Sequence, residues 1–428
     1  MISTLLASSP IANAYHGGST VAVVTVSEAS VLVTIDEIRS ARERVGEVVR
    51  PTPTERSDSL SRIVGRPVLL KPEHLQRSGS FKIRGAYNFM ATVAAGVEVV
   101  AGSAGNHAQG VALAASLTGH RSRVFMPERA ALPKLQATAD YGAHVVTIPG
   151  GVDLCIDRAR EYAAAEGAVF VPPFEHPAII AGQGTVALEI LEEAPDVETV
   201  LVSVGGGGLL AGVGAAIKAI RPDVRVVGIQ AEGASSMRRS IAAGHPVEVE
   251  PATMADGVAL RRPGALTFAH ARAFADEIVT VSEEEISRAV LLLLERAKAV
   301  VEPSGALPVA ALIAGVVSGT GPAVAVLSGG NVDPLLLTRL VAHGLSAAAR
   351  FMVVRVVLDD RPGALHHLTG VLARLGLNVL SVEHHREGLA LPLASVEAVF
   401  TVETRDAAHQ ADVREQLQLE GYRVEQVR

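Results

Sequence analysis

The sequence contains no tryptophan, and aromatic residues make up only 3% of its 428 residues. Its lysines and arginines form no dense cluster, and the formal net charge is −7. Nucleic-acid-binding proteins need basic surfaces and aromatic stacking groups, so this composition argues against a nucleic-acid partner. No apolar run reaches the roughly 18 residues that a spanning helix needs, which argues against a membrane partner.

Cysteine is also scarce. Cys155 occurs alone, so the chain cannot form an intramolecular disulfide, and a cytoplasmic location is expected. Cys155 lies in a helix-like run and is predicted to be a small buried residue. Residues 1–32 carry no lysine or arginine, and a signal peptide needs a positive start, so this segment is predicted to be a disordered extension.

Hydrophobic residues are plentiful, at 49%, and they are mostly alanine, valine and leucine. Such a composition suits a buried parallel sheet covered by helices. Strand-like and helix-like runs alternate from Val68 to Asp333, which is typical of a parallel α/β architecture. The strand-like runs are residues 68–70, 97–101, 123–126, 144–148, 199–204, 225–230 and 323–328.

Lys82 stands in the run Gln-Arg-Ser-Gly-Ser-Phe-Lys-Ile-Arg-Gly-Ala, residues 76–86. A lysine forms a Schiff base with an aldehyde when a tight, partly apolar setting lowers the pKa of its amine. Phe81 precedes this lysine, and Gly79 and Gly85 are predicted to let the backbone approach a cofactor closely. The motif alone fits a surface lysine in a loop equally well.

Two further turns follow strand-like runs and precede helix-like ones. Ser-Ala-Gly-Asn-His-Ala-Gln-Gly occupies residues 103–110, and the N–H groups of such a helix start form an anion site that suits a carboxylate. Four successive glycines occupy residues 205–208, before a helix-like run at 209–220. Their N–H groups would cradle a phosphate.

The glycine run permits an alternative. It also fits a dinucleotide-binding fingerprint, Gly206-x-Gly208-x-x-Ala211, and Glu232 stands near the end of the next strand-like run, where a ribose-binding acid is expected. This pattern would indicate a nicotinamide enzyme. It leaves Lys82 unexplained and does not require four successive glycines, so it is the weaker interpretation.

Together and in this order, the three motifs resemble the β-family, or fold type II, of pyridoxal-phosphate enzymes. The wording of residues 80–85 and 103–110 resembles specifically the threonine and serine dehydratases, also called threonine ammonia-lyases. The resemblance runs from about Val33 to about Gly344. It implies a two-domain parallel α/β core like that of tryptophan synthase β. It also implies conversion of L-threonine to 2-oxobutanoate and ammonia, and of L-serine to pyruvate.

The resemblance also implies a set of site residues around pyridoxal 5'-phosphate. It assigns the cofactor's Schiff base and the catalytic base to Lys82, places Phe81 beside the ring, and gives Asn106 the ring hydroxyl. Ser328 is the implied partner of the ring nitrogen; because serine is neutral, the nitrogen need not be protonated, which favours prompt loss of a β-hydroxyl. The implied phosphate site is the backbone of Gly205, Gly206, Gly207, Gly208 and Leu209, and the implied carboxylate site is Ser103, Ala104, Gly105, Asn106 and His107.

Serine racemase is the nearest alternative within this fold. It needs a hydroxyl at the position of Ala104, so racemisation is not expected. Other lyases or synthases of the fold, and a non-catalytic amino-acid sensor, are weaker alternatives.

Several acidic residues are harder to assign. Glu302 matches a position near the ring, but its Pro-Ser-Gly context also fits a helix cap. No metal site is predicted, because Arg238 stands where the companion acid of Glu232 is needed. Helix-start or surface roles are predicted for Asp153, Asp256 and Glu283-Glu284-Glu285.

The C-terminal residues show a different order. From Phe351 a strand–helix–strand–strand–helix–strand pattern predicts a ferredoxin-like unit. The turn at 360–365 and Asn378 resemble an ACT domain, a module that binds amino-acid effectors. The implied effector residues are Pro362, Gly363, Ala364, Leu365 and Asn378, and the implied effectors are isoleucine or valine. The alternative is a domain that serves only dimer contacts.

The predicted domains are a catalytic domain at 33–345, with a small subdomain at about 81–175, and a regulatory domain at 350–428. A linker is predicted around His343–Arg350. The resemblance implies a homodimer or homotetramer.

Overall fold

The computed structural model describes residues 32–386 and 394–427. All but the last residue of the predicted extension 1–32 therefore lies outside the described residues. The chain forms two compact units that divide between Asp333 and Pro334. Within the described part of the chain, the helices are too short or too polar to span a membrane.

The centre of the first unit is a six-stranded sheet with the order β1-β2-β10-β7-β8-β9. All its neighbouring strands are parallel except the short edge strand β1, which pairs antiparallel with β2. Strand β7 is buried along its whole length, as expected where helices cover both faces. The strands are β1 (Glu55–Arg56), β2 (Val68–Lys71), β7 (Thr199–Ser203), β8 (Arg225–Ala231), β9 (Glu277–Val281) and β10 (Ala323–Val326).

Helices surround this sheet, and several begin where the sequence offers a cap. Ser282 and Glu285 form a capping box at the start of α11, so the acidic run at 283–285 is a helix start, as predicted. The helices are α1 (Ile35–Val45), α2 (Asp58–Val64), α7 (Pro177–Glu193), α8 (Gly208–Ile220), α9 (Ser236–Ala243), α10 (Ala265–Phe274), α11 (Glu283–Leu292) and α12 (Pro303–Ile313). Short turns are η2 (Glu73–Leu75), η3 (Glu232–Ala234), η4 (Asp256–Val258) and the π-helical η5 (Leu293–Ala297).

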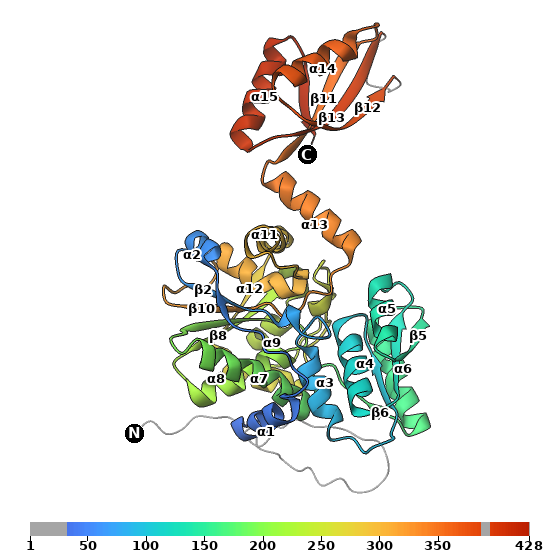
Figure 1. Cartoon of the computed structure of the whole chain (residues 1–428), viewed down its shortest axis with the longest axis vertical. Coiled ribbons are helices and arrows are strands. Elements are labelled where there is room, and N and C mark those ends of the chain that lie inside the picture. The colour runs from blue at the N-terminus through green and yellow to red at the C-terminus, as the bar shows by residue number, and fades with distance from the viewer. Residues whose placement is uncertain (1–31, 387–393, 428) are drawn as a thin grey trace. The chain divides into compact units, whose positions relative to one another are not determined.

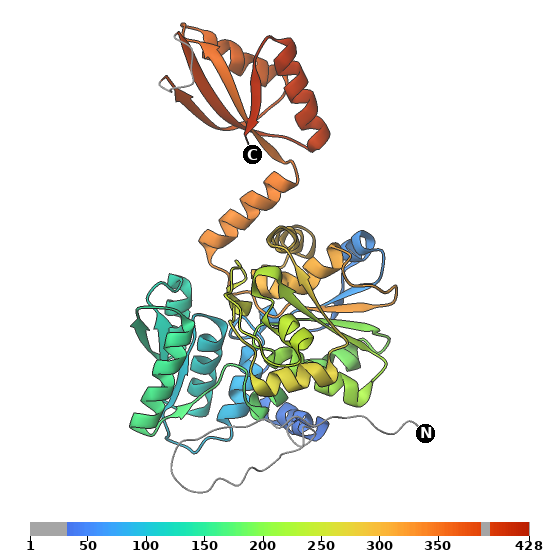
Figure 2. The same ribbon diagram turned by 180° about the vertical axis from the view of Figure 1, so that it is seen from behind.

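A second, four-stranded parallel sheet, with the order β5-β4-β3-β6, is formed by residues from the middle of the first unit's sequence. This sheet and its helices form the small subdomain, which stands beside the six-stranded sheet in both views (Figures 1 and 2). Its elements are β3 (Val99–Gly102), α4 (Asn106–Thr118), β4 (Ser122–Pro127), α5 (Leu132–Asp140), β5 (His144–Ile148), α6 (Val152–Glu166) and β6 (Val169–Phe170). Helix α3 (Lys82–Met90) precedes them.

Cys155 of α6 is fully buried in this subdomain, as predicted. It packs in one cluster with Val100 of β3 and Phe125 of β4. Burial raises the pKa of its thiol to about 11, so the side chain acts as a small apolar residue rather than a nucleophile.

The second unit begins with α13 (Pro334–Ala347) and continues as a ferredoxin-like fold, as predicted. Its sheet has the order β12-β13-β11-β14 and is antiparallel throughout. The segment expected to be a linker is partly helical, because Gly344 lies inside α13. The remaining elements are β11 (Phe351–Asp359), α14 (Ala364–Arg374), β12 (Val379–His385), β13 (Ser395–Glu403), α15 (Ala407–Leu419) and β14 (Val424–Val427). The domain boundaries drawn from the sequence stay predictions.

The implied effector residues do not come together within one chain. The turn with Pro362 and Gly363 follows the end of β11, where Asp359 pairs with Ser395. Asn378 lies at the opposite end of the sheet, where its carbonyl accepts a hydrogen bond from the N–H of Glu403. The nine residues of β11 separate these ends, a length of about 30 Å at 3.3 Å per residue.

Candidate active site

All the predicted catalytic, cofactor and substrate residues line one pocket in the first unit. The pocket takes walls from the small subdomain and from the loops at the carboxyl ends of the six-stranded sheet. Ends of parallel strands meet at one edge of a sheet, so motifs far apart in sequence converge there. The predicted residues in the lining are Phe81, Lys82, Ser103, Ala104, Gly105, Asn106, His107, Gly205, Gly206, Gly207, Gly208, Leu209 and Ser328.

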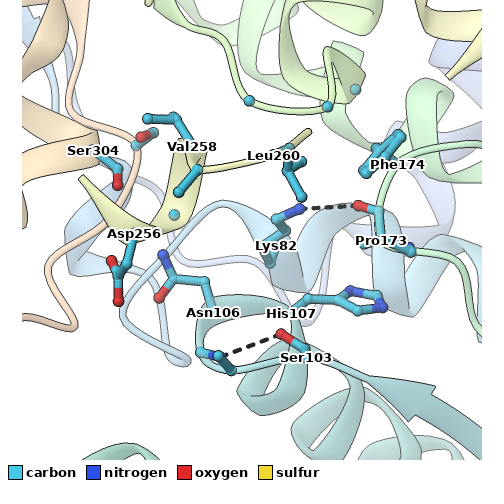
Figure 3. Close-up of a pocket in the computed structure, with 18 of the residues that line it drawn as sticks. Lys82, Ser103, Asn106, His107, Pro173, Phe174, Asp256, Val258, Leu260 and Ser304 are labelled. Atoms are coloured by element: carbon cyan, nitrogen blue, oxygen red, sulfur yellow. Dashed lines mark hydrogen bonds between the residues drawn. The ribbon is translucent and has the colours of Figure 1, made fainter. Parts of the chain in front are cut away.

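Lys82 is the first residue of α3, and its amine points into the pocket (Figure 3). The Nζ donates a hydrogen bond to the carbonyl of Pro173 at 2.9 Å and lies 5.3 Å from the centre of the Phe81 ring. Burial lowers the pKa of the amine to about 8, although Glu302 opposes the shift. An amine with this pKa has a substantial neutral fraction slightly above neutral pH, whereas an ordinary lysine has almost none, and a nucleophile or general base requires the neutral form.

Asn106 is the first residue of α4, and both the nitrogen and the oxygen of its side-chain amide form hydrogen bonds. Its Nδ2 donates to Glu302 Oε1 at 2.5 Å, and its Oδ1 accepts from Asn331 Nδ2 at 2.8 Å. Asn331 also donates to the carbonyl of Ser78 at 2.8 Å. The sequence identified Asn106 but gave no sign of the Asn331 contact, which joins segments 225 residues apart.

Glu302 belongs to the pocket rather than to a helix cap. It precedes α12, but its side chain makes no capping hydrogen bond. Burial raises the pKa of the carboxyl to about 7; Asp256 raises it further, while Lys134 and Asn106 lower it. Near neutral pH the Glu302 carboxyl is therefore present in both its protonated and its ionised form.

Glu302→Gln should make the cofactor-free protein more stable at pH 8, by on the order of 3 kcal/mol. The folded state favours the protonated acid. The contribution of Glu302 to the free energy of unfolding is therefore fully present below its unfolded pKa of 4.5, and it is lost as the pH rises through about 7. Glutamine mimics the protonated acid at every pH. Urea unfolding at pH 5 and pH 8 checks this, and an equal difference at both pH values contradicts it.

The glycine run forms a cradle between β7 and α8. Gly207 has a φ of 91°, which favours glycine. A Cβ on Gly206 would collide with the Phe174 ring, and one on Gly205 would lie 3.0 Å from the Cα of Val258. These positions therefore require glycine. The loop presents its backbone at the start of a 13-residue helix, where an anion is favoured.

Buried polar atoms in the lining also suit a polar ligand. Within the described residues, the hydroxyl oxygens of Ser203 and Ser304 and the Gln183 Oε1 are buried without a hydrogen-bond partner. Buried polar groups normally have partners, so these atoms are available to a bound molecule. The reactive lysine, the glycine cradle and these atoms fit pyridoxal 5'-phosphate.

The loop from Ser103 to His107 lines the wall opposite the glycine cradle. The N–H of Gly105 donates to Ser103 Oγ at 3.2 Å (Figure 3). His107 Nε2 contacts the carbonyl of Val171 at 3.0 Å, and burial, with Lys82, lowers the pKa of the ring to about 3. Because His107 is neutral, it adds no charge attraction for a carboxylate, whereas the backbone N–H groups and the start of α4 do.

One prediction around this site is wrong. Gly79 and Gly85 do not line the pocket. A Cβ on Gly79 would collide with the Asn331 amide, and one on Gly85 would collide with the Gln183 amide. These glycines therefore serve close packing of protein against protein. Asp256 starts η4 and is exposed, as predicted, and it also lines the pocket and pairs with Lys134.

Sequence reasoning missed Lys134, Pro173 and Phe174 as lining residues. Lys134 and Asp256 lie 122 positions apart, and neither stands in a glycine-rich motif. Only the fold brings them together.

The profile of the family described as "Pyridoxal-phosphate dependent enzyme" matches residues 45–329. The chain belongs to this family. The match spans Lys82 and the glycine cradle together, which favours the phosphate interpretation over the dinucleotide one. A second profile, described as "ACT domain", matches residues 352–418, so this pyridoxal-phosphate enzyme carries an ACT domain.

Several named proteins align with most of this sequence. An L-threonine ammonia-lyase of Thermotoga maritima is 44% identical over 92% of this chain and 99% of its own. The catabolic L-threonine dehydratase of Escherichia coli is 42% identical over 70% of this chain and 94% of its own. Among solved structures, a threonine deaminase isoform from Solanum lycopersicum has a TM-score of 0.67 and 33% identity, covering 72% of this chain and 88% of that one. A maize serine racemase has a TM-score of 0.68 and 33% identity, covering 74% and 98%.

Proposed function

We propose that this pyridoxal-phosphate enzyme is an L-threonine ammonia-lyase that also acts on L-serine. The products are 2-oxobutanoate and ammonia from threonine, and pyruvate and ammonia from serine. The observation that carries the proposal is the convergence of Lys82, Asn106, the glycine cradle and Ser328 on one pocket. Relatives with the same name and nearly the same length support it.

Each residue in the pocket has a distinct task in this proposal. When bound, the cofactor supplies the electron sink that makes the α-proton of an amino acid acidic. Lys82 Nζ would hold the cofactor's aldehyde carbon and, once the substrate amine replaces it, take the α-proton as general base. Backbone N–H groups of Gly205 to Leu209 would bind the phosphate, those from Ser103 to Asn106 the substrate carboxylate, and the Ser328 hydroxyl the ring nitrogen.

Keto-acid formation from L-threonine by the purified full-length chain tests the function directly. We expect turnover that depends on added pyridoxal 5'-phosphate, with slower formation of pyruvate from L-serine. A protein that binds the cofactor and leaves both amino acids unchanged would be an amino-acid sensor instead.

Racemisation is the second candidate, because serine racemases are among the similar solved structures. Racemisation needs a proton donor on the face of the substrate opposite Lys82. Position 104, in the loop expected to bind the substrate, is an alanine, which has no hydroxyl.

Ala104→Ser should therefore introduce serine racemase activity that the native chain lacks. The added hydroxyl can donate a proton, whereas the methyl group cannot. Chiral analysis of serine after incubation measures the change, with Ala104→Val as the control that adds bulk without a hydroxyl. Racemisation by the native chain as fast as dehydration would show that Ala104 does not exclude it.

The C-terminal unit is proposed to regulate the enzyme by binding isoleucine or valine. The lining of a cavity in this unit includes Asn378, two arginines, the acid Glu403 and apolar side chains, so it offers charges of both signs to an amino acid. Within the described residues, Arg350 and Arg405 have no ion-pair partner. We also propose that the chain forms a homodimer or homotetramer. The proposed location is the cytoplasm, which suits a chain with one cysteine.

Truncation after Ala348 should leave a core that turns over threonine but no longer responds to isoleucine or valine. An effector changes activity only by binding two states unequally, and the truncated chain lacks its site. Initial rates with and without each amino acid measure the response, and calorimetry on the full-length chain measures binding. If no binding occurs outside the active site and truncation only dissociates the oligomer, the unit serves assembly.

A further inference from the structure

Lys134 and Asp256 face each other at the pocket from two different subdomains. Lys134 lies on α5 of the small subdomain, and its side chain is only 10% exposed. Asp256 begins η4 beside the six-stranded sheet, and its side chain is 53% exposed. The Lys134 ammonium and the Asp256 carboxylate form an ion pair, and both residues line the pocket.

The lysine is held against the loop expected to take the substrate carboxylate. A Cβ on Gly105 would lie 3.4 Å from Lys134 Nζ and 3.5 Å from its Cδ. The hydroxyl of Thr138, which is fully buried, donates to the carbonyl of Lys134 at 2.8 Å. Gly105 precedes α4 and Lys134 lies on α5, and both belong to the small subdomain, so a movement of this subdomain would carry the lysine and the loop together.

The aspartate is fixed to the other wall. The N–H of Met254 donates to Glu283 Oε2 at 2.9 Å. A Cβ on Gly257 would lie 2.7 Å from Ser304 Oγ, so the η4 backbone packs closely on α12. Figure 3 shows Asp256 beside Ser304 and Asn106 at the pocket. The carboxylate therefore stands on a part of the molecule that packs against the phosphate cradle and Glu302.

We propose that Lys134 and Asp256 are a latch that fixes the small subdomain over the bound amino acid, so that both act as positioning residues. The proposal rests on the proposed function, because the bound amino acid is the substrate. With the latch formed, the Ser103–Asn106 loop stays in place relative to Lys82 and the cradle. Correct placement of reacting groups is a large part of catalysis, so an enzyme without the latch binds and turns over threonine less well.

Charge exchange separates a latch from a direct substrate contact. Asp256→Asn and Lys134→Met should each raise the KM for threonine and lower kcat/KM by roughly tenfold, as expected for loss of a partly buried ion pair. The double variant Lys134→Asp/Asp256→Lys should recover most of the loss, since the pair can form again. If Lys134 instead binds the substrate carboxylate itself, the exchanged variant places an aspartate there and is worse than either single variant.

Hydrogen exchange supplies a readout that does not depend on turnover. L-2-Aminobutanoate, which is threonine without its hydroxyl, serves as the bound ligand in the cofactor-loaded protein. In the native chain this ligand should slow amide exchange in α5 and at residues 253–258 together. In Asp256→Asn, exchange in α5 should stay fast, while Lys134→Asp/Asp256→Lys should restore the protection.

Lys218→Met is the matched control. Lys218 is also a partly buried lysine paired with an aspartate, Asp276, but both lie outside the pocket lining. This variant should leave KM and the protection of α5 unchanged. Failure of the native chain to turn over threonine would overturn the proposed function. Native turnover with no recovery in the exchanged variant would overturn the latch alone.

Discussion

Lys82→Ala should reduce threonine turnover to background while the protein stays folded. The substitution removes the amine that would hold the cofactor's aldehyde and the base that would take the α-proton. Loss of such a central group typically costs several orders of magnitude in kcat. Keto-acid formation over long incubations measures the residual rate. Steady-state turnover by this variant without an added amine would refute the assignment of Lys82.

The folded state of this variant can be checked separately. Burial lowers the pKa of the Lys82 amine, so the folded chain opposes the charge that the unfolded chain carries. At pH 7 the charged Lys82 therefore lowers the free energy of unfolding. This cost disappears as the pH rises from about 8, where the folded chain loses the proton, toward 10.5, where the unfolded chain loses it. The cofactor-free alanine variant should therefore be at least as stable as the cofactor-free native chain at pH 7, and an unfolded variant would not test the chemistry.

Arg84→Met should destabilise the first unit by about 3–5 kcal/mol, because it leaves the fully buried carboxylate of Glu73 without the arginine it pairs with. Arg84 is 1% exposed and stands two residues after Lys82 on α3. Its guanidinium donates to both oxygens of Glu73 at 2.7 Å and to those of Glu189 at 2.6 and 2.8 Å. Burial alone would raise the pKa of Glu73, but Arg84 holds it below the usual range. Urea unfolding followed by circular dichroism measures the loss.

A double variant tells the cause of that loss. Arg84→Met/Glu73→Gln removes the charge that Arg84 balanced most closely, since Glu73 is fully buried. It should recover part of the lost stability, whereas Glu73→Gln alone should destabilise. No recovery would mean that packing of the long arginine side chain, rather than charge balance, carries the effect.

The sequence allowed the architecture and most of the pocket to be predicted because the informative residues stand at strand ends. Lys82, Asn106 and the glycine cradle each lie in a short motif, and a parallel sheet brings such turns to one edge. Gly79 and Gly85 carried the same signal but serve protein packing. A glycine shows that something approaches the backbone, not what approaches it.

Contacts between distant segments could not be predicted in the same way. Lys134 and Asp256 have ordinary surroundings in the sequence, and their pairing depends on how the two subdomains of the first unit are placed. Glu302 was ambiguous for a related reason. Its neighbours fit a helix start, and only the absence of a capping bond and its contact with Asn106 assign its side chain to the pocket.

The separation of Pro362 and Gly363 from Asn378 has a consequence for control of the enzyme. A small amino acid cannot touch both ends of a nine-residue strand, so a ligand that uses both must lie between two copies of the unit. Binding would then be linked by mass action to association of the chains. The sensitivity of such an enzyme to its effector would rise with the concentration of the enzyme. Dilution of the enzyme alone would abolish the response to the effector.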